Sequence, residues 1–227
     1  MNNLVECILR DVETAKIRCG GQVKTGLVRK IAGKSFTKLR TQTRERILSV
    51  CDELLAAGGW ELRTIAFDFA FRLKDFIERD RIILYRWLAD YVRDWGGCDD
   101  LCTHAFGLYL FQYPDYFKEV LTWTHSEQWW IRRASAVVQI YSIRRKRMLN
   151  EALAIADLLL HDEVELVRKG FGWMLKEIGA HDPAIVYGYV VARQAAMPRV
   201  ALRYAVEKLD PELRRKALGR NQANRSK

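Results

Sequence analysis

The sequence has little proline, no long apolar run and too few cysteines for a disulfide framework. Its 227 residues include four prolines and five cysteines. Because no apolar stretch reaches about 18 residues, we expect no membrane span. The odd number of scattered cysteines predicts free thiols in a reducing compartment. The opening segment MNNLVECILRDVETAK contains acidic residues and fits neither a signal peptide nor an organelle presequence, so we expect a cytoplasmic protein.

Common catalytic and metal-binding motifs are also missing from the sequence. There is no Gly-rich phosphate loop, no Gly-x-Ser-x-Gly and no His-Glu-x-x-His. A metal site would have to recruit Cys98, Cys102, His104 and His125, none of which forms a second pair at zinc spacing. A thiol nucleophile would have only His104 as a nearby base. We therefore expect no metal and no cofactor.

Positive charge is the feature that the composition has in excess. Lys and Arg number 38 against 28 Asp and Glu, which gives a formal net charge of +10. Such a field attracts polyanions, namely DNA, RNA or an anionic membrane surface. The alternative is an incidental excess of basic residues. Hydrophobic residues make up 49% of the chain, which excludes disorder as a global description.

Helical periodicity extends over almost the whole chain, and strand alternation is nearly absent. Helices are predicted at 2–18, 22–33, 41–57, 60–74, 79–94, 98–111, 114–124, 127–145, 147–160, 163–179, 183–195, 198–208 and 211–219. Gly-Gly pairs at 20–21, 58–59 and 96–97 predict short turns. Pro183, Pro198 and Pro211 are each expected at the first helical position.

The second half of the sequence reads as stacked helix pairs. In each pair a basic, Trp-containing helix precedes a more apolar one, as in WWIRRASAVVQIYSI followed by MLNEALAIADLLL. Degenerate pairs of this kind are typical of HEAT repeats. We therefore predict an all-α, HEAT-like helical-repeat superhelix (an α-solenoid) with a basic concave face. Residues 1–227 are expected to form a single domain, in which 209–227 is a frayed basic tail.

Two segments combine aromatic and basic side chains. In WWIRRASAVV (129–138), Trp130 and the apolar residues after it form a core stripe, Arg133 lies at its edge, and Arg132 points more toward solvent. Arg133 can snorkel, pair with a carboxylate or hold a bound anion. In LVRKGFGWMLKEIG (166–179), two glycines cost a helix about 1 kcal/mol each relative to Ala, so close approach of another backbone is expected. Trp173 shares a helical line with Lys169 and Glu177 and fits either a sugar or base contact, or packing between repeats.

A third segment, WGGCDDLCTH (95–104), contains two adjacent carboxylates. The Gly-Gly pair is expected to end one helix, and Asp99 and Asp100 to lie in the first turn of the next. Carboxylates in that position are commonly helix caps. A role in chemistry is the alternative.

Five segments in this order resemble the HEAT-like alkylpurine DNA glycosylases of the AlkD type. They are VKTGLVRKIAG (23–33), DYVRDWGGCDDLC (90–102), EQWWIRRASAV (127–137), VRKGFGWMLKE (167–177) and MPRVALRYAVEKL (197–209). The resemblance implies a monomer that cradles double-stranded DNA on its concave face, without a cofactor or an obligate protein partner. It also implies release of cationic purines alkylated at N3 or N7 by N-glycosidic hydrolysis.

The resemblance also assigns roles to individual residues. The DNA-contacting arginine of the family falls on Arg133 and a lesion-facing tryptophan on Trp173. Arg132, Lys169, Lys176 and Arg199, in the same segments, complete the set expected to bind DNA. These side chains would hold the backbone phosphates.

The sequence departs from the family at its catalytic Trp-Asp-x-x-Asp pattern. The aromatic position is Cys98, the next acid is Asp99, and the catalytic carboxylate position is Cys102. Asp99 or Asp100 could replace the carboxylate, and Trp95 the aromatic group, each with a shifted backbone. Two alternatives to a glycosylase are therefore a non-catalytic protein that binds DNA structure and a protein–protein scaffold.

Overall fold

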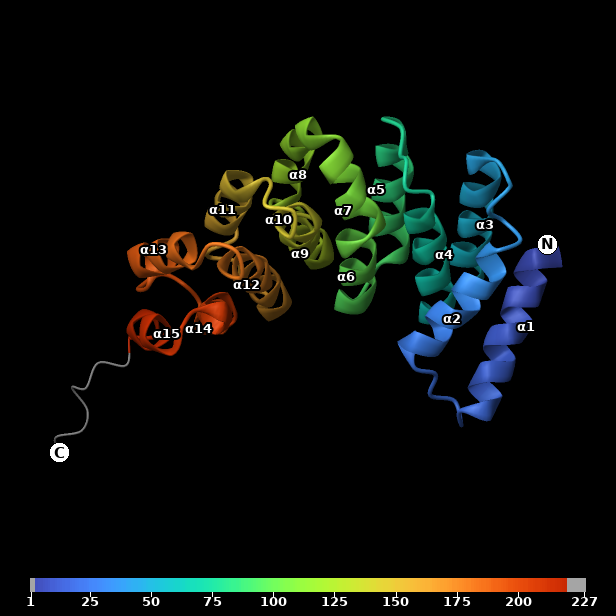
Figure 1. Cartoon of the computed structure of the whole chain (residues 1–227), viewed down its shortest axis with the longest axis horizontal. Coiled ribbons are helices and arrows are strands. Elements are labelled where there is room, and N and C mark those ends of the chain that lie inside the picture. The colour runs from blue at the N-terminus through green and yellow to red at the C-terminus, as the bar shows by residue number, and fades with distance from the viewer. Residues whose placement is uncertain (1–2, 220–227) are drawn as a thin grey trace. The chain divides into compact units, whose positions relative to one another are not determined.

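The chain is helical wherever the structure describes it. The computed structural model describes residues 3–219, and this part contains helices and no strand (Figure 1). The predicted all-α class is thereby confirmed. The elements are α1 (Asn3–Arg18), α2 (Thr25–Phe36), α3 (Arg44–Ala57), α4 (Trp60–Arg72), α5 (Asp80–Tyr91), α6 (Trp95–Thr103), α7 (Ala105–Gln112), η1 (Pro114–Tyr116), α8 (Phe117–Trp123), α9 (Trp129–Val137), α10 (Ile140–Ile143), α11 (Leu149–Leu158), α12 (Glu165–Gly179), α13 (Pro183–Arg193), α14 (Arg199–Ala205), η2 (Val206–Lys208) and α15 (Pro211–Ala217). Within residues 3–219 no helix combines the length and apolarity that a membrane crossing requires.

Two compact units make up the chain, residues 1–109 and 110–227. In the first unit α4 is the central helix, since it packs against α2, α3 and α6. Its residues 61–70 are buried with the exception of Arg63, which is half-buried. The two buried carboxylates of this helix are paired, Glu61 with Lys16 and Asp68 with Arg72. Gly58 and Gly59, both at positive φ (80° and 88°), form the tight turn that returns the chain from α3 to α4.

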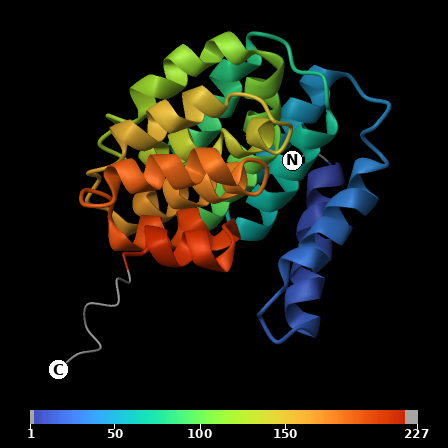
Figure 2. The same cartoon turned by 60° about the vertical axis from the view of Figure 1, so that its left-hand side comes forward.

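In the second unit the central helix is α12. It lies between α9 and α14 and also contacts α11 and α13 (Figure 1). Phe171, Met174, Leu175 and Ile178 are fully buried on its core side. The view in Figure 2 brings forward α13 with α14 and α15, which end the described part of this unit. Pairs of helices packed on neighbouring pairs are the arrangement that the repeated sequence pattern predicts.

Several helix boundaries differ from those predicted from the sequence. Gly96 and Gly97 do not end a helix but lie in the first turn of α6, because Asp94 caps that helix three residues earlier than expected. The segment predicted as one helix at 98–111 is divided at His104, and 127–145 is divided between α9 and α10. Pro198 is the N-cap of α14 rather than its first residue, whereas Pro183 and Pro211 begin their helices as predicted.

The last described helix, α15, forms within the segment predicted as a basic tail. Asp210 caps it, with its carboxylate accepting hydrogen bonds from the Glu212 and Leu213 amides at 2.9 and 3.0 Å. The Gln194 side-chain amide donates to the Ala217 carbonyl at 2.7 Å and fixes the other end. Residues 220–227, the remainder of the predicted tail, lie outside the described residues.

Candidate nucleic-acid interface

The start of α6 is held by an acid and an arginine. The Asp94 carboxylate accepts a hydrogen bond from the Gly97 amide at 2.8 Å and pairs with Arg63 at 2.7 Å. Burial raises the pKa of Asp94, but the Gly97 amide and the Arg63 guanidinium outweigh it and leave that pKa below its ordinary value. A Cβ at Gly97 would lie 2.6 Å from the Arg63 guanidinium carbon, so glycine is required for this arginine to lie against the helix.

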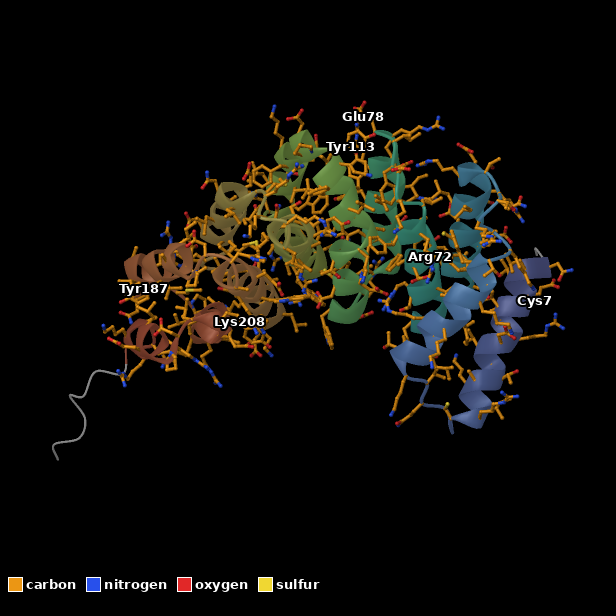
Figure 3. All side chains as sticks on the ribbon, viewed as in Figure 1. Cys7, Arg72, Glu78, Tyr113, Tyr187 and Lys208 are labelled. Atoms are coloured by element: carbon orange, nitrogen blue, oxygen red, sulfur yellow. The ribbon has the colours of Figure 1, made fainter. Side chains whose placement is uncertain are left out.

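Asp100 takes part in an ion-pair network inside the first unit. Its carboxylate pairs with Arg29 at 2.5 Å, and Arg29 also lies 3.7 Å from Asp68. Asp68 in turn accepts a 2.5 Å hydrogen bond from Arg72, which Figure 3 labels. His104 Nδ1 lies 3.5 Å from the Asp100 carboxylate. Asp100 therefore links α6 to α2 and, through Arg29, to α4.

Trp95 and Asp99 occupy a different face of α6. Because they are four residues apart, their side chains lie on the same side of the helix, one turn from each other. Trp95 is 57% exposed and Asp99 is half-buried. An aromatic face and a carboxylate are thus neighbours on regular helical backbone, without the shift that the resemblance to the family implies.

Cys98 and Cys102 face the interior. Both are 0% exposed, so positions 98 and 102 cannot present a group to an external ligand. The two positions that the resemblance aligns with the family's aromatic group and carboxylate therefore carry buried thiols in this chain. The accessible pair of the same chemical types, one turn apart, is Trp95 and Asp99.

The side chain of Arg133 extends from α9 to α12. It is 5% exposed and donates a hydrogen bond to the Leu166 carbonyl. Gly170 makes room for it, because a Cβ there would lie 3.0 Å from Arg133 Cγ. Gly172 allows a second close approach, in which a Cβ would lie 2.8 Å from the Ala201 carbonyl oxygen of α14. The predicted close approach of a backbone is found at Gly172, whereas at Gly170 the neighbour is the Arg133 side chain. DNA contact by Arg133 stays a prediction, and a phosphate would have to compete with the Leu166 carbonyl.

Arg132 is half-buried and thus lies closer to solvent than the buried Arg133, as the sequence predicts. Its guanidinium pairs with Asp162 at 2.5 Å and donates to the Ser126 carbonyl at 2.8 Å. Asp162 also accepts a hydrogen bond from the Val164 amide at 2.9 Å, immediately before α12. Arg132 therefore braces the start of α12, since its partner holds the backbone there.

The Trp173 indole is fixed by an acid on its own helix. Its N–H donates to Glu177 at 2.8 Å, which agrees with the predicted line of Trp173 and Glu177. Arg144 binds the same carboxylate through two hydrogen bonds of 3.0 Å each. Burial raises the pKa of Glu177, but the bonds from Arg144 and Trp173 outweigh it, so that pKa lies below its ordinary value. The half-buried indole is thereby held in one orientation.

The remaining predicted DNA contacts lie near the surface of the second unit. Lys169 pairs with Glu165 at 2.5 Å and Lys176 with Glu207 at 2.6 Å. Surface pairs of this kind contribute about 0–1 kcal/mol, so a phosphate can replace the carboxylate at little cost. Arg199 is exposed and donates to the Leu218 carbonyl at 2.8 Å.

The fold and these segments together define an all-α protein of repeated helix pairs. The family model described as DNA alkylation repair enzyme matches residues 16–209. The chain belongs to this family, and its function is connected with DNA repair. The match reaches the same C-terminal limit, residue 209, as the resemblance in the sequence. Among curated proteins, none matches the chain.

Proposed function

We propose that the protein is a monofunctional glycosylase that binds double-stranded DNA as a monomer. Its substrates are purines made cationic by alkylation at N3 or N7. The observation that carries this proposal is the Trp95–Asp99 pair on α6, in a chain of the DNA alkylation repair family. Asp99 is preferred to Asp100 because it shares its helix face with the exposed Trp95, whereas Asp100 links α6 to Arg29 of α2.

The reaction needs little from the protein because the leaving group is activated beforehand. The C1′–N bond of the alkylated nucleoside breaks, and its electron pair neutralises the positive charge on the purine. A carboxylate at Asp99 stabilises the positive charge that develops on the sugar and accepts a proton from the water that adds to C1′. The exposed face of Trp95 attracts the cationic base through a cation–π contact. No lysine occurs in residues 95–104, so no Schiff-base step is proposed.

The basic side chains of the second unit supply duplex affinity in this proposal. Lys169 and Lys176 exchange weak carboxylate partners for phosphates, and Arg199 offers an exposed guanidinium. Trp173, fixed by Glu177, is a further aromatic group proposed to contact DNA. Arg132 and Arg133 contribute first to packing around α12, and contact with DNA requires them to exchange Asp162 and the Leu166 carbonyl for phosphates.

Two neighbouring carboxylates give a matched test. Duplexes containing 7-methylguanine or 3-methyladenine are incubated with the protein, and free base is measured. Asp99→Asn should reduce release by about 100-fold or more, as expected for loss of a charge-stabilising group. Asp100→Asn should retain release but unfold more easily, because Arg29 loses the closer of its two carboxylate partners. Equal release by wild type and Asp99→Asn contradicts the assignment.

A second candidate function is binding of DNA structure without base excision. The observation that favours it is the burial of Cys98 and Cys102 at the positions where the family has its aromatic group and carboxylate. Duplex binding without release of either base by the wild-type protein would select this function. Absence of duplex binding at low salt would exclude both functions and favour a protein–protein scaffold.

A further inference from the structure

Four arginines surround one pocket at the C-terminal end of the second unit. The pocket has a volume of about 610 Å³. Arg199 and Arg203 come from α14 and Arg214 and Arg215 from α15, and Leu209, Pro211 and Leu218 complete the lining. Lys208, labelled in Figure 3, belongs to the short η2 turn between these two helices.

No acidic side chain lines this pocket. The three acids between residues 199 and 219 bind elsewhere: Glu207 pairs with Lys176 at 2.6 Å, and Glu212 with Lys216 at 2.7 Å. Asp210 caps α15. Within the described part of the chain, no carboxylate forms an ion pair with any of the four guanidinium groups. Glu212 interacts with Arg215 only beyond ion-pair distance, so the lining of the pocket keeps an excess of positive charge.

The backbone that carries the arginines is fixed. Ala217 is buried, and its carbonyl accepts the Gln194 amide at 2.7 Å. The Leu218 carbonyl accepts a hydrogen bond from Arg199 at 2.8 Å, which ties α14 to the end of α15. Gly219, at a φ of +64°, lies directly after this helix end. The arginines thus converge from two anchored helices rather than from a loop.

We propose that this pocket binds phosphate groups. A guanidinium fork matches two phosphate oxygens, and several forks around one concavity select a ligand with more than one negative charge. The volume lies within the range of about 300–1,000 Å³ that is usual for small-molecule sites. The phosphates come either from a nucleic-acid backbone or from a free polyphosphate. The site does not depend on base excision, which uses α6 of the other unit.

The test is calorimetric titration of the full chain with inorganic pyrophosphate at low salt. Wild type should bind saturably, and Arg214→Ala/Arg215→Ala should bind at least tenfold more weakly. The matched control, Arg18→Ala/Arg40→Ala, removes the same charge from two exposed arginines in the other unit and should bind like wild type. Arg203→Ala removes a pocket arginine from α14 rather than from α15 and should also weaken pyrophosphate binding. Melting curves check that each variant is folded.

Two results overturn the proposal. One is a wild type without saturable pyrophosphate binding. The other is equal weakening in the pocket variant and the matched control, which would mean that only overall charge is sensed.

The source of the phosphates follows from a second measurement. Duplex affinity is measured against salt for wild type and for the Arg214→Ala/Arg215→Ala variant. If the DNA backbone fills the pocket, the negative slope of log K against log salt becomes shallower by about 0.9 for each phosphate that the variant no longer neutralises, and pyrophosphate competes with duplex. If free polyphosphate is the ligand, the slope is unchanged while the variant still fails to bind pyrophosphate. A chain that binds pyrophosphate but neither binds duplex nor releases base refutes the proposed function and leaves the pocket intact.

Discussion

Gly172 and Gly188 should respond to alanine in opposite directions. Both are helical glycines, on α12 and α13 respectively. A Cβ at Gly172 would lie 2.8 Å from the Ala201 carbonyl oxygen, 2.9 Å from Ala201 Cα and 2.9 Å from Tyr204 Cβ. A Cβ at Gly188 would meet no atom within 4 Å. The same substitution therefore adds a methyl group to a filled space in one helix and to open space in the other.

The magnitudes follow from packing and helix propensity. Overpacking costs about 1–3 kcal/mol, and the upper part of this range applies at Gly172 because two of the three contacts are backbone atoms. Alanine recovers about 1 kcal/mol through its higher helix propensity. Gly172→Ala should thus lower the free energy of unfolding by about 1–2 kcal/mol. Gly188→Ala should raise it by about 0.5–1 kcal/mol.

Urea unfolding followed by circular dichroism measures both effects. The two variants should differ by about 1.5–3 kcal/mol, which is well above the uncertainty of comparing midpoints at equal slope. Gly172→Ala at or above wild-type stability would show that α14 moves away from α12 without cost. That result would refute the account of why glycine is needed at this crossing.

Two further predictions concern titration and thiol chemistry. Because the folded pKa of Glu177 is lowered from 4.5, its carboxylate stabilises the fold above that pH and loses this contribution as the pH falls through the folded value. Glu177→Gln should therefore lose less stability than wild type between pH 7 and pH 3 in urea unfolding; an equal loss would contradict the Arg144 pairing. Exposed Cys19 should react with a thiol reagent in the native protein, whereas Cys51, whose pKa is raised chiefly by burial, should react only after denaturation. Rapid native labelling of Cys51 would contradict its burial.

The helices could be predicted from the sequence where an apolar stripe and a clear cap coincide. The apolar stripe of residues 163–179 is continuous and predicts one helix there. The structure agrees, since α12 runs from Glu165 to Gly179. The divisions at His104 and after Val137 could not be predicted, since the apolar pattern continues across them. The Gly96-Gly97 pair predicts a turn in the sequence. The Asp94 cap and the Arg63 contact, which hold both glycines in a helix, depend on side-chain geometry that the local sequence does not show.

The candidate site was predictable in its residue types and less so in its geometry. Trp95 and Asp99 are both candidate site residues in the sequence, and their spacing of four residues indicates that they share a helix face. The burial of Cys98 and Cys102 agrees with the usual behaviour of free cysteine as a small apolar residue, but the alignment with the family's aromatic and carboxylate positions drew attention away from it. The partners of Arg132 and Asp100 lie 30 and 71 residues away, beyond the reach of local pattern. The pocket between α14 and α15 likewise depends on packing.

Gly170 and Gly172 of α12 differ in whether a second substitution can compensate for their replacement. At Gly170 the obstructing atoms belong to the Arg133 side chain, so a shorter residue at 133 should suppress the defect of Gly170→Ala. At Gly172 two obstructing atoms, the carbonyl oxygen and Cα of residue 201, are present whatever amino acid occupies that position. Positions 133 and 170 should therefore show strong epistasis and vary together among viable sequences. Position 172 has no such suppressor, and reversion to glycine is its simplest repair.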